Sequence, residues 1–169
     1  DDCSCEYVLL DVTSEASWRT AIGTILARHG RIDILLNGAG VACDGDDVLH
    51  CTPEIWRKTL AVNLDGTFLG CKLVSAVMKD HGGGSIINIA SINGVTGDGG
   101  FVAEGVAAYA SSKAGVRMLT KSAALDLAAR GTNVRCNAIL PGYFATPMVL
   151  DYIAAHPDGA DALARIKEA

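Results

Sequence analysis

Short apolar segments that alternate with helical segments constrain the fold of this chain more than any other feature of its sequence. Four of these segments are apolar at consecutive positions, which is typical of strands buried on both faces. They are YVLLDV (Tyr7–Val12), IDILLN (Ile32–Asn37), SIINIAS (Ser85–Ser91) and VRCNAIL (Val134–Leu140). Strands of this kind, separated by helices, predict an α/β fold with a doubly wound parallel sheet that helices cover on both sides.

Capping residues mark the helices that separate the strands. Thr13 and Ser14 are candidate N-caps, and Gly30 is the expected end of the helix that follows them. A threonine followed by a proline predicts a long helix over Thr52–His81, and apolar periodicity predicts another over Val106–Arg130. We expect residues 142–169 to form a loop and short helices on the substrate side of the same domain.

Composition and charge exclude several classes of protein. A chain of 169 residues suits one domain, so we treat residues 1–169 as a single unit. The net charge of −5, without a basic cluster, argues against nucleic-acid binding. The six cysteines lack the spacing of metal ligands, and no run of about 18 apolar residues indicates a membrane span. We therefore expect a cytoplasmic protein with no metal, nucleic-acid or membrane partner.

Polar or glycine-rich residues follow each predicted strand. They are Asp11, the stretch Asn37-Gly38-Ala39-Gly40, Ser91 and the pair Pro141-Gly142. Ligands of open α/β sheets bind beyond the carboxyl ends of the strands. We therefore expect these four positions to line one crevice.

Tyr109 and Lys113 are a candidate pair for chemistry, although such pairs also occur by chance in many helices. Their i, i+4 spacing in YASSK places both on one helix face. A nearby ammonium stabilises a phenolate and would lower the pKa of Tyr109 toward neutrality, as a general acid–base in alcohol–ketone interconversion requires. The alternative interpretation is a helix whose small residues simply pack against a neighbour.

Five motifs in order along the chain resemble the short-chain dehydrogenase/reductase family: NGAG, VNLDG, INIAS, YASSK and CNAILPGYFATPM. The resemblance implies a Rossmann-like fold and an NAD(P)-dependent oxidoreductase that interconverts a secondary alcohol and its ketone. It makes Tyr109 the proton donor or acceptor, and gives Lys113 the roles of lowering its pKa and binding the nicotinamide ribose. Ser91 would orient the substrate oxygen, and Asn63 would hold a water that relays protons from Lys113.

The same resemblance implies a site for NAD or NADP, with NAD slightly favoured. Gly38 departs from the family pattern, which usually has asparagine at this position. The implied cofactor-binding residues are Asp11, Val12, Asn37, Ala39, Gly40, Tyr109, Lys113, Pro141, Gly142 and Thr146. For Asp11, the alternative is a purely local role as a cap before Thr13.

The substrate side of the site is less well defined by the motifs. The residues expected to face the substrate are Ile92, Asn93, Tyr143 and Met148, together with the long loop between Ser91 and Tyr109. Similar family members act on secondary and cyclic alcohols, hydroxysteroids or 3-oxoacyl thioesters. The resemblance also implies a homo-oligomer, a tetramer or a dimer, that forms through the two long helices.

Two other functions are compatible with the same fold. A cofactor-free lyase of the haloalcohol dehalogenase kind would carry arginine at the Lys113 position. A non-catalytic binding protein or inactive fragment would not need Ser91, Tyr109 and Lys113 together. Both alternatives are therefore weaker than the oxidoreductase.

Two parts of the family pattern are absent from the sequence. These are the glycine-rich phosphate turn after the first strand and the last helix–strand unit, so we expect a partial domain that lacks the first strands and the last strand. The predicted strand Tyr7–Val12 would then stand apart from Ile32–Asn37 by about three strand spacings, near 14 Å. We predict that this chain alone is unstable or aggregates, and that it binds dinucleotide poorly.

Overall fold

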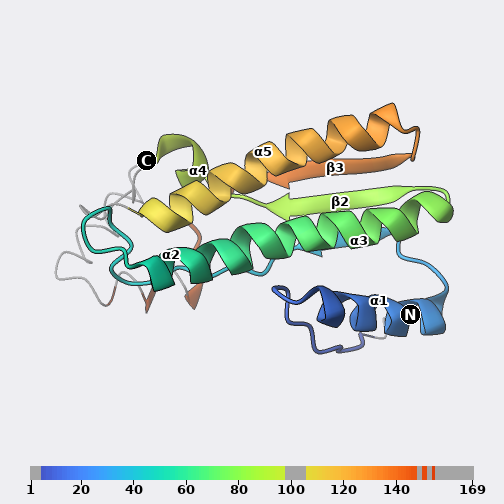
Figure 1. Ribbon diagram of the computed structural model, residues 1–169, viewed down its shortest axis with the longest axis horizontal. Helices are drawn as coiled ribbons and strands as arrows, with labels where there is room; N and C mark the ends of the chain where they lie inside the picture. The colour runs from blue at the N-terminus through green and yellow to red at the C-terminus, as the bar shows by residue number, and fades with distance from the viewer. Residues whose placement is uncertain (1–4, 98–105, 148–149, 152–153, 155–169) are drawn as a thin grey trace.

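The structure is a computed structural model, and it describes residues 5–97, 106–147, 150, 151 and 154. Helices and strands alternate along the chain, as the sequence predicts (Figure 1). The elements are α1 (Glu15–His29), β1 (Ile34–Asn37), α2 (Pro53–Leu60), η1 (Ala61–Asp65), α3 (Gly66–Asp80), β2 (Gly84–Ile89), α4 (Asn93–Thr96), α5 (Ala107–Ala129) and β3 (Val134–Ile139). The segment η1 is a turn of π-helix, and it joins α2 and α3 into one continuous rod.

The predicted caps lie at the helix ends. The Ser14 hydroxyl accepts a hydrogen bond from the Ser17 amide (3.2 Å), and the Thr52 hydroxyl accepts one from the Ile55 amide (3.2 Å). Gly30 ends α1 at φ 75°, a left-handed conformation that glycine adopts without steric cost. The predicted helix boundaries are therefore confirmed to within a residue or two.

The three strands form one parallel sheet in the order β1-β2-β3. Asn37 of β1 is paired in register with Asn88 of β2, and Ile89 of β2 with Ile139 of β3. The α2–η1–α3 rod connects β1 to β2, and α5 connects β2 to β3 (Figure 1). These are the parallel crossovers of an α/β fold, so the predicted fold class is confirmed.

The predicted strand Tyr7–Val12 is wrong. The described part of this segment forms no strand, and its backbone is tied to α1 instead of to a sheet. The Asp11 amide donates to the Ser17 hydroxyl (2.9 Å), and the Trp18 indole donates to the Val12 carbonyl (3.0 Å). A strand requires a neighbouring strand as hydrogen-bond partner, and none lies beside this segment among the described residues. As expected, however, the segment does not pair with β1.

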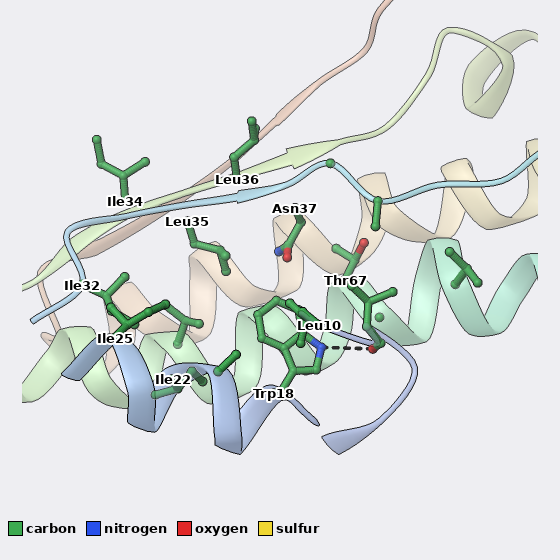
Figure 2. A pocket seen from close by; sticks show the side chains of 17 residues that line it. Leu10, Trp18, Ile22, Ile25, Ile32, Ile34, Leu35, Leu36, Asn37 and Thr67 are labelled. Carbon is green, nitrogen blue, oxygen red and sulfur yellow. Dashed lines mark hydrogen bonds between the residues drawn. The ribbon is translucent and has the colours of Figure 1, made fainter. Parts of the chain in front are cut away.

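The described helices cover only one face of the sheet. Within the described residues, the expectation of helices on both faces is therefore not met. Along β1, Leu35 and Asn37 point toward α1 and α3, whereas Ile34 and Leu36 point to the opposite side (Figure 2). Ile34 is 67% exposed and Leu36 is 59% exposed. The uncovered face is therefore apolar, as expected for a strand that needs cover on both sides.

An apolar cavity of about 320 Å³ lies between α1 and β1 (Figure 2). Leu10, Trp18, Ile22 and Leu36 are among the residues that line it. In the described residues β1 pairs only with β2, so its other edge is free and lies beside this cavity. Sheet edges with apolar surroundings favour pairing with further strands. The instability of this chain alone remains a prediction, and the cavity, the free edge and the exposed face all support it.

The rod Pro53–Asp80 has the length and composition of a membrane-spanning helix, with 28 residues and a mean hydropathy of 1.3 over its most apolar window. Its glycines let it approach other elements closely: a side chain at Gly66 would meet Val12, and one at Gly70 would meet Asn37 and Trp18. Val74 and Met78 farther along the rod are fully buried in the core. The rod is therefore a core helix of the domain, as small residues at close contacts indicate.

Candidate active site

A second cavity, of about 380 Å³, opens at the carboxyl ends of the strands. Because parallel strands all end at the same edge of the sheet, the loops that follow them converge there. The cavity is lined by Gly38, Gly40, Ile89, Ala90, Ser91, Tyr109, Lys113, Pro141, Gly142, Phe144, Thr146 and Pro147. The predicted crevice therefore contains positions after β1, β2 and β3 and the first two turns of α5.

Tyr109 and Lys113 lie together in the first turns of α5. The Lys113 ammonium is 5.7 Å from the centre of the Tyr109 ring, and it donates a hydrogen bond to the Ile89 carbonyl (2.8 Å). Lys113 is only 5% exposed, so this carbonyl at the end of β2 stabilises a charge that is nearly removed from water. The ammonium is thereby fixed between the strand end and the tyrosine.

Burial changes the ionisation of both residues. It lowers the pKa of Lys113 from 10.5 to about 8, so the side chain remains mostly cationic at neutral pH. Burial also raises the pKa of Tyr109, while a hydrogen bond with Ser91 lowers it by a smaller amount. The expected shift of the Tyr109 pKa toward neutrality is therefore not found in this structure, because desolvation of the phenolate outweighs the interactions that favour it.

Ser91 connects the tyrosine to the segment that follows β2. Its hydroxyl accepts a hydrogen bond from the Asn93 amide (3.2 Å), and its side chain is largely buried. The Asn93 carboxamide oxygen in turn accepts a hydrogen bond from the Tyr143 hydroxyl (3.3 Å). Two of the predicted substrate residues thus contact each other beside Ser91. Ile92 is 40% exposed, and Met148 lies outside the described residues.

Asn63 occupies the π-helical turn η1 and is fully buried. Its carboxamide oxygen accepts from the Val41 amide (2.8 Å), and its nitrogen donates to the Val41 carbonyl (3.0 Å) and to the Ser112 hydroxyl (3.0 Å). A Cβ atom on Gly40 would lie 3.5 Å from both the Asn63 oxygen and the Lys113 ammonium. Asn63 and Lys113 therefore border one small space, which is compatible with the relay expected from the resemblance.

Asn37 braces the sheet instead of facing the site. Its nitrogen donates to the Asn88 carboxamide oxygen (2.8 Å), and the Asn88 nitrogen donates to the Thr120 hydroxyl of α5 (2.9 Å). This buried chain links β1, β2 and α5. The sequence analysis did not identify Asn88 and Thr120. The position of Asn88 inside an apolar strand could have indicated a buried hydrogen bond.

The other proposed cofactor residues lie elsewhere. Val12 and Ala39 line the apolar cavity beside α1, and not the cavity that contains Tyr109. One Asp11 oxygen accepts hydrogen bonds from the Thr13 amide (2.9 Å) and hydroxyl (2.7 Å), which lower the pKa of Asp11. This is the local capping role that the sequence left open. Among the described residues, no three His, Cys, Asp or Glu side chains cluster as they would around a metal ion.

A parallel α/β sheet with a cavity at its carboxyl edge, lined by serine, tyrosine and lysine, places this chain among the Rossmann-like α/β proteins. Comparison with known families agrees, because the family described as "short chain dehydrogenase" matches residues 2–156. The chain belongs to the short-chain dehydrogenase/reductase family.

The sequence is also similar to those of individual dehydrogenases. The chain is 42% identical over 146 residues to the NADP-dependent (R)-specific alcohol dehydrogenase of Lentilactobacillus kefiri, covering 86% of this chain and 56% of that protein. It is 40% identical over 157 residues to the cyclopentanol dehydrogenase of Comamonas testosteroni, covering 93% of this chain and 59% of the relative. The 3-alpha-(or 20-beta)-hydroxysteroid dehydrogenase of Mycobacterium tuberculosis (strain H37Rv) is 42% identical over 145 residues, with coverages of 86% and 53%.

A solved structure gives the same result for the fold. A chain from Burkholderia xenovorans, described as belonging to the short-chain dehydrogenases/reductases, matches with a TM-score of 0.83 and 38% identity. The match covers 94% of this chain and 58% of that one. This chain thus spans between half and three-fifths of the length of the relatives that it matches.

Proposed function

We propose that the whole protein interconverts a secondary alcohol and its ketone with NAD or NADP, using Tyr109 as general acid–base. The observation that carries this proposal is the convergence of Ser91, Tyr109 and Lys113 on one cavity at the carboxyl edge of the sheet. These three side chains provide a hydroxyl for the substrate oxygen, a proton-transfer group and a nearby cation. The relatives named as alcohol and hydroxysteroid dehydrogenases support the same reaction class.

The residues of this cavity fit the nicotinamide–ribose end of a dinucleotide. Gly38 and Gly40 leave the floor of the cavity open, because a larger side chain at Gly40 would extend toward Asn63 and Lys113. The Lys113 ammonium would donate to ribose hydroxyls, and Pro141, Gly142 and Thr146 would lie against the nicotinamide. When bound, the cofactor supplies the hydride acceptor for oxidation and the hydride donor for reduction.

The positions of the side chains support the following proposed proton steps. In reduction, the Tyr109 hydroxyl donates its proton to the carbonyl oxygen of the ketone, and the Ser91 hydroxyl donates a hydrogen bond to the same oxygen. In oxidation, the tyrosinate accepts the hydroxyl proton while two electrons leave the carbinol carbon as hydride. Burial keeps Tyr109 protonated at neutral pH, which suits reduction, so the rate of oxidation should rise with pH as the phenol ionises.

In this proposal either NAD or NADP serves as the cofactor. One relative is named as NADP-dependent, whereas our sequence interpretation slightly favours NAD. Ile92 and Phe144 expose apolar surface near the site, which favours a substrate with an apolar body. We propose that the substrate is a small or cyclic secondary alcohol.

We also propose that the whole protein forms a homo-oligomer through the α2–α3 rod and α5.

A screen with purified whole protein tests the proposed function. Propan-2-ol, cyclopentanol and a 3-hydroxysteroid are each incubated with NAD⁺ and with NADP⁺, and the reduced cofactor is measured by its absorbance. We expect turnover of at least one of these secondary alcohols with one of the two cofactors. Absence of turnover with every pair, from folded protein that binds neither cofactor, would refute the proposal.

A further inference from the structure

We propose that Asp46 is a positioning residue that fixes the first turn of α5 and thereby holds Tyr109 in place for proton transfer. The inference rests on the proposed function, because it concerns the placement of the proposed acid–base. Asp46 lies in the loop between β1 and α2, 63 residues before Tyr109 in the sequence. Neither the sequence motifs nor the cavity lining includes it.

Three consecutive amides at the start of α5 are bound by this one residue. The Asp46 carbonyl accepts from the Ala107 amide (2.7 Å), and the two carboxylate oxygens accept from the Ala108 amide (2.6 Å) and the Tyr109 amide (2.8 Å). The first amides of a helix have no acceptor within the helix itself. Asp46 therefore replaces a local cap, since Val106 makes no side-chain capping bond.

The carboxylate is suited to this role by its burial and charge. Asp46 is 5% exposed, so its charge is stabilised mainly by the amides that it binds and by the positive end of the helix dipole. The Cys51 thiol also donates to one of its oxygens, at 3.5 Å. Because an unpaired buried amide is unfavourable, loss of this carboxylate would destabilise the start of the helix.

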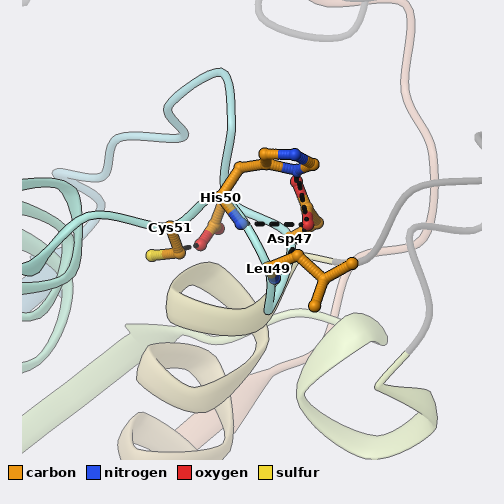
Figure 3. Close-up of polar contacts among 5 residues, drawn as sticks. Asp47, Leu49, His50 and Cys51 are labelled. Carbon is orange, nitrogen blue, oxygen red and sulfur yellow. Dashed lines mark hydrogen bonds and ion pairs between the residues drawn. The ribbon is translucent and has the colours of Figure 1, made fainter.

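The turn that follows Asp46 keeps it in position. The Asp47 carboxylate accepts hydrogen bonds from the Leu49 amide (2.9 Å) and the His50 amide (3.2 Å), and it contacts the His50 ring at 2.8 Å (Figure 3). The Cys51 amide donates to the Asp47 carbonyl (2.9 Å), which closes the turn. Asp46 is thus presented by a hydrogen-bonded turn and not by a loose loop.

Asp46 contacts the proposed acid–base residue directly. The Tyr109 amide is itself one of the three bound groups, so any shift of the helix start moves the residue that carries the phenol. The Tyr109 carbonyl also accepts from the Ser112 hydroxyl (2.7 Å), which in turn accepts from Asn63. A misplacement of about 1 Å at a reacting group can lower a rate by roughly 10²-fold.

The kinetic test compares Asp46→Ala and Asp46→Asn with Thr52→Ala in the whole protein. Thr52→Ala removes a hydrogen-bonded N-cap of α2, a helix that carries none of the proposed site residues, and so controls for the cost of losing a cap. We expect Asp46→Ala to lower kcat by roughly 10²-fold while KM for the alcohol changes by less than about threefold. Asparagine keeps one acceptor oxygen, so kcat of Asp46→Asn should lie between those of Asp46→Ala and the wild type. Thr52→Ala should have the kcat of the wild type.

A second readout does not depend on turnover. With tyrosine labelled at Cζ, the Tyr109 resonance is assigned by its absence in Tyr109→Phe. We expect this resonance to shift in Asp46→Asn and to stay in place in Thr52→Ala. If the wild type has no turnover, the proposed function fails, and the resonance alone then decides the role of Asp46. An unshifted Tyr109 resonance in folded Asp46→Asn, or equal kcat in Asp46→Ala, Thr52→Ala and wild type, would overturn the inference.

Discussion

Tyr109→Phe is expected to lower kcat for alcohol oxidation and for ketone reduction by roughly 10³-fold or more in the whole protein. The substitution removes a single oxygen atom, so the ring can keep its buried position next to Lys113 and Ser91. What is lost is the group that donates or accepts the proton at the substrate oxygen. Steady-state kinetics in both directions measure this effect directly.

The affinity for the dinucleotide should change little in this variant, because Lys113 and the glycine-lined floor of the cavity remain. Tyr7→Phe is the matched control: Tyr7 is 86% exposed and lies outside the site, so the same chemical change there should leave kcat unaltered. Turnover retained in Tyr109→Phe would show that another group handles the proton.

Lys113→Met is expected to impair both turnover and cofactor binding. Methionine keeps much of the length and volume of the side chain but removes the ammonium, and with it the contact to Ile89 and the cation beside the phenol. We expect kcat to fall by roughly 10²-fold or more and the dinucleotide Kd to rise at least about tenfold. Lys121→Met, on an exposed position of the same helix, serves as the control.

The same variant should also alter how stability depends on pH. The pKa of Lys113 is lowered to about 8 in the folded protein, so between about 8 and 10.5 the unfolded chain binds the additional proton. Stability of the wild type should therefore rise with pH through this window, by up to about 3 kcal/mol. Lys113→Met should lack this rise. An equal pH dependence of the unfolding free energy in both proteins would contradict the burial of the ammonium.

Local signals in the sequence were sufficient for most of the fold. The apolar runs predicted β1, β2 and β3, and the capping residues Ser14, Gly30 and Thr52 predicted the helix ends. These features depend on neighbouring residues, which a single sequence displays. The convergence of Ser91, Pro141 and Gly142 at one edge also followed, because strand direction alone determines which loops converge. The expected place of Tyr109 and Lys113 at this edge came from the resemblance to the family.

Features that depend on partners distant in the chain were not predicted. Tyr7–Val12 has the composition of a strand, but strand formation needs a neighbour, and the segment is bound to α1 instead. The raised pKa of Tyr109 depends on burial by the folded site. Asp46 carries no signal of its own, since its three amide partners are about 60 residues away.

Transfer of deuterium from substrate to cofactor tests the central claim most directly. Whole protein is incubated with propan-2-ol or cyclopentanol deuterated at the carbinol carbon, with NAD⁺ or NADP⁺, and the reduced cofactor is analysed by mass spectrometry. The account predicts that the reduced cofactor from the wild type carries the deuterium and that Tyr109→Phe forms almost none. Ketone formation without deuterium in the cofactor, or equal transfer by Tyr109→Phe, would contradict it.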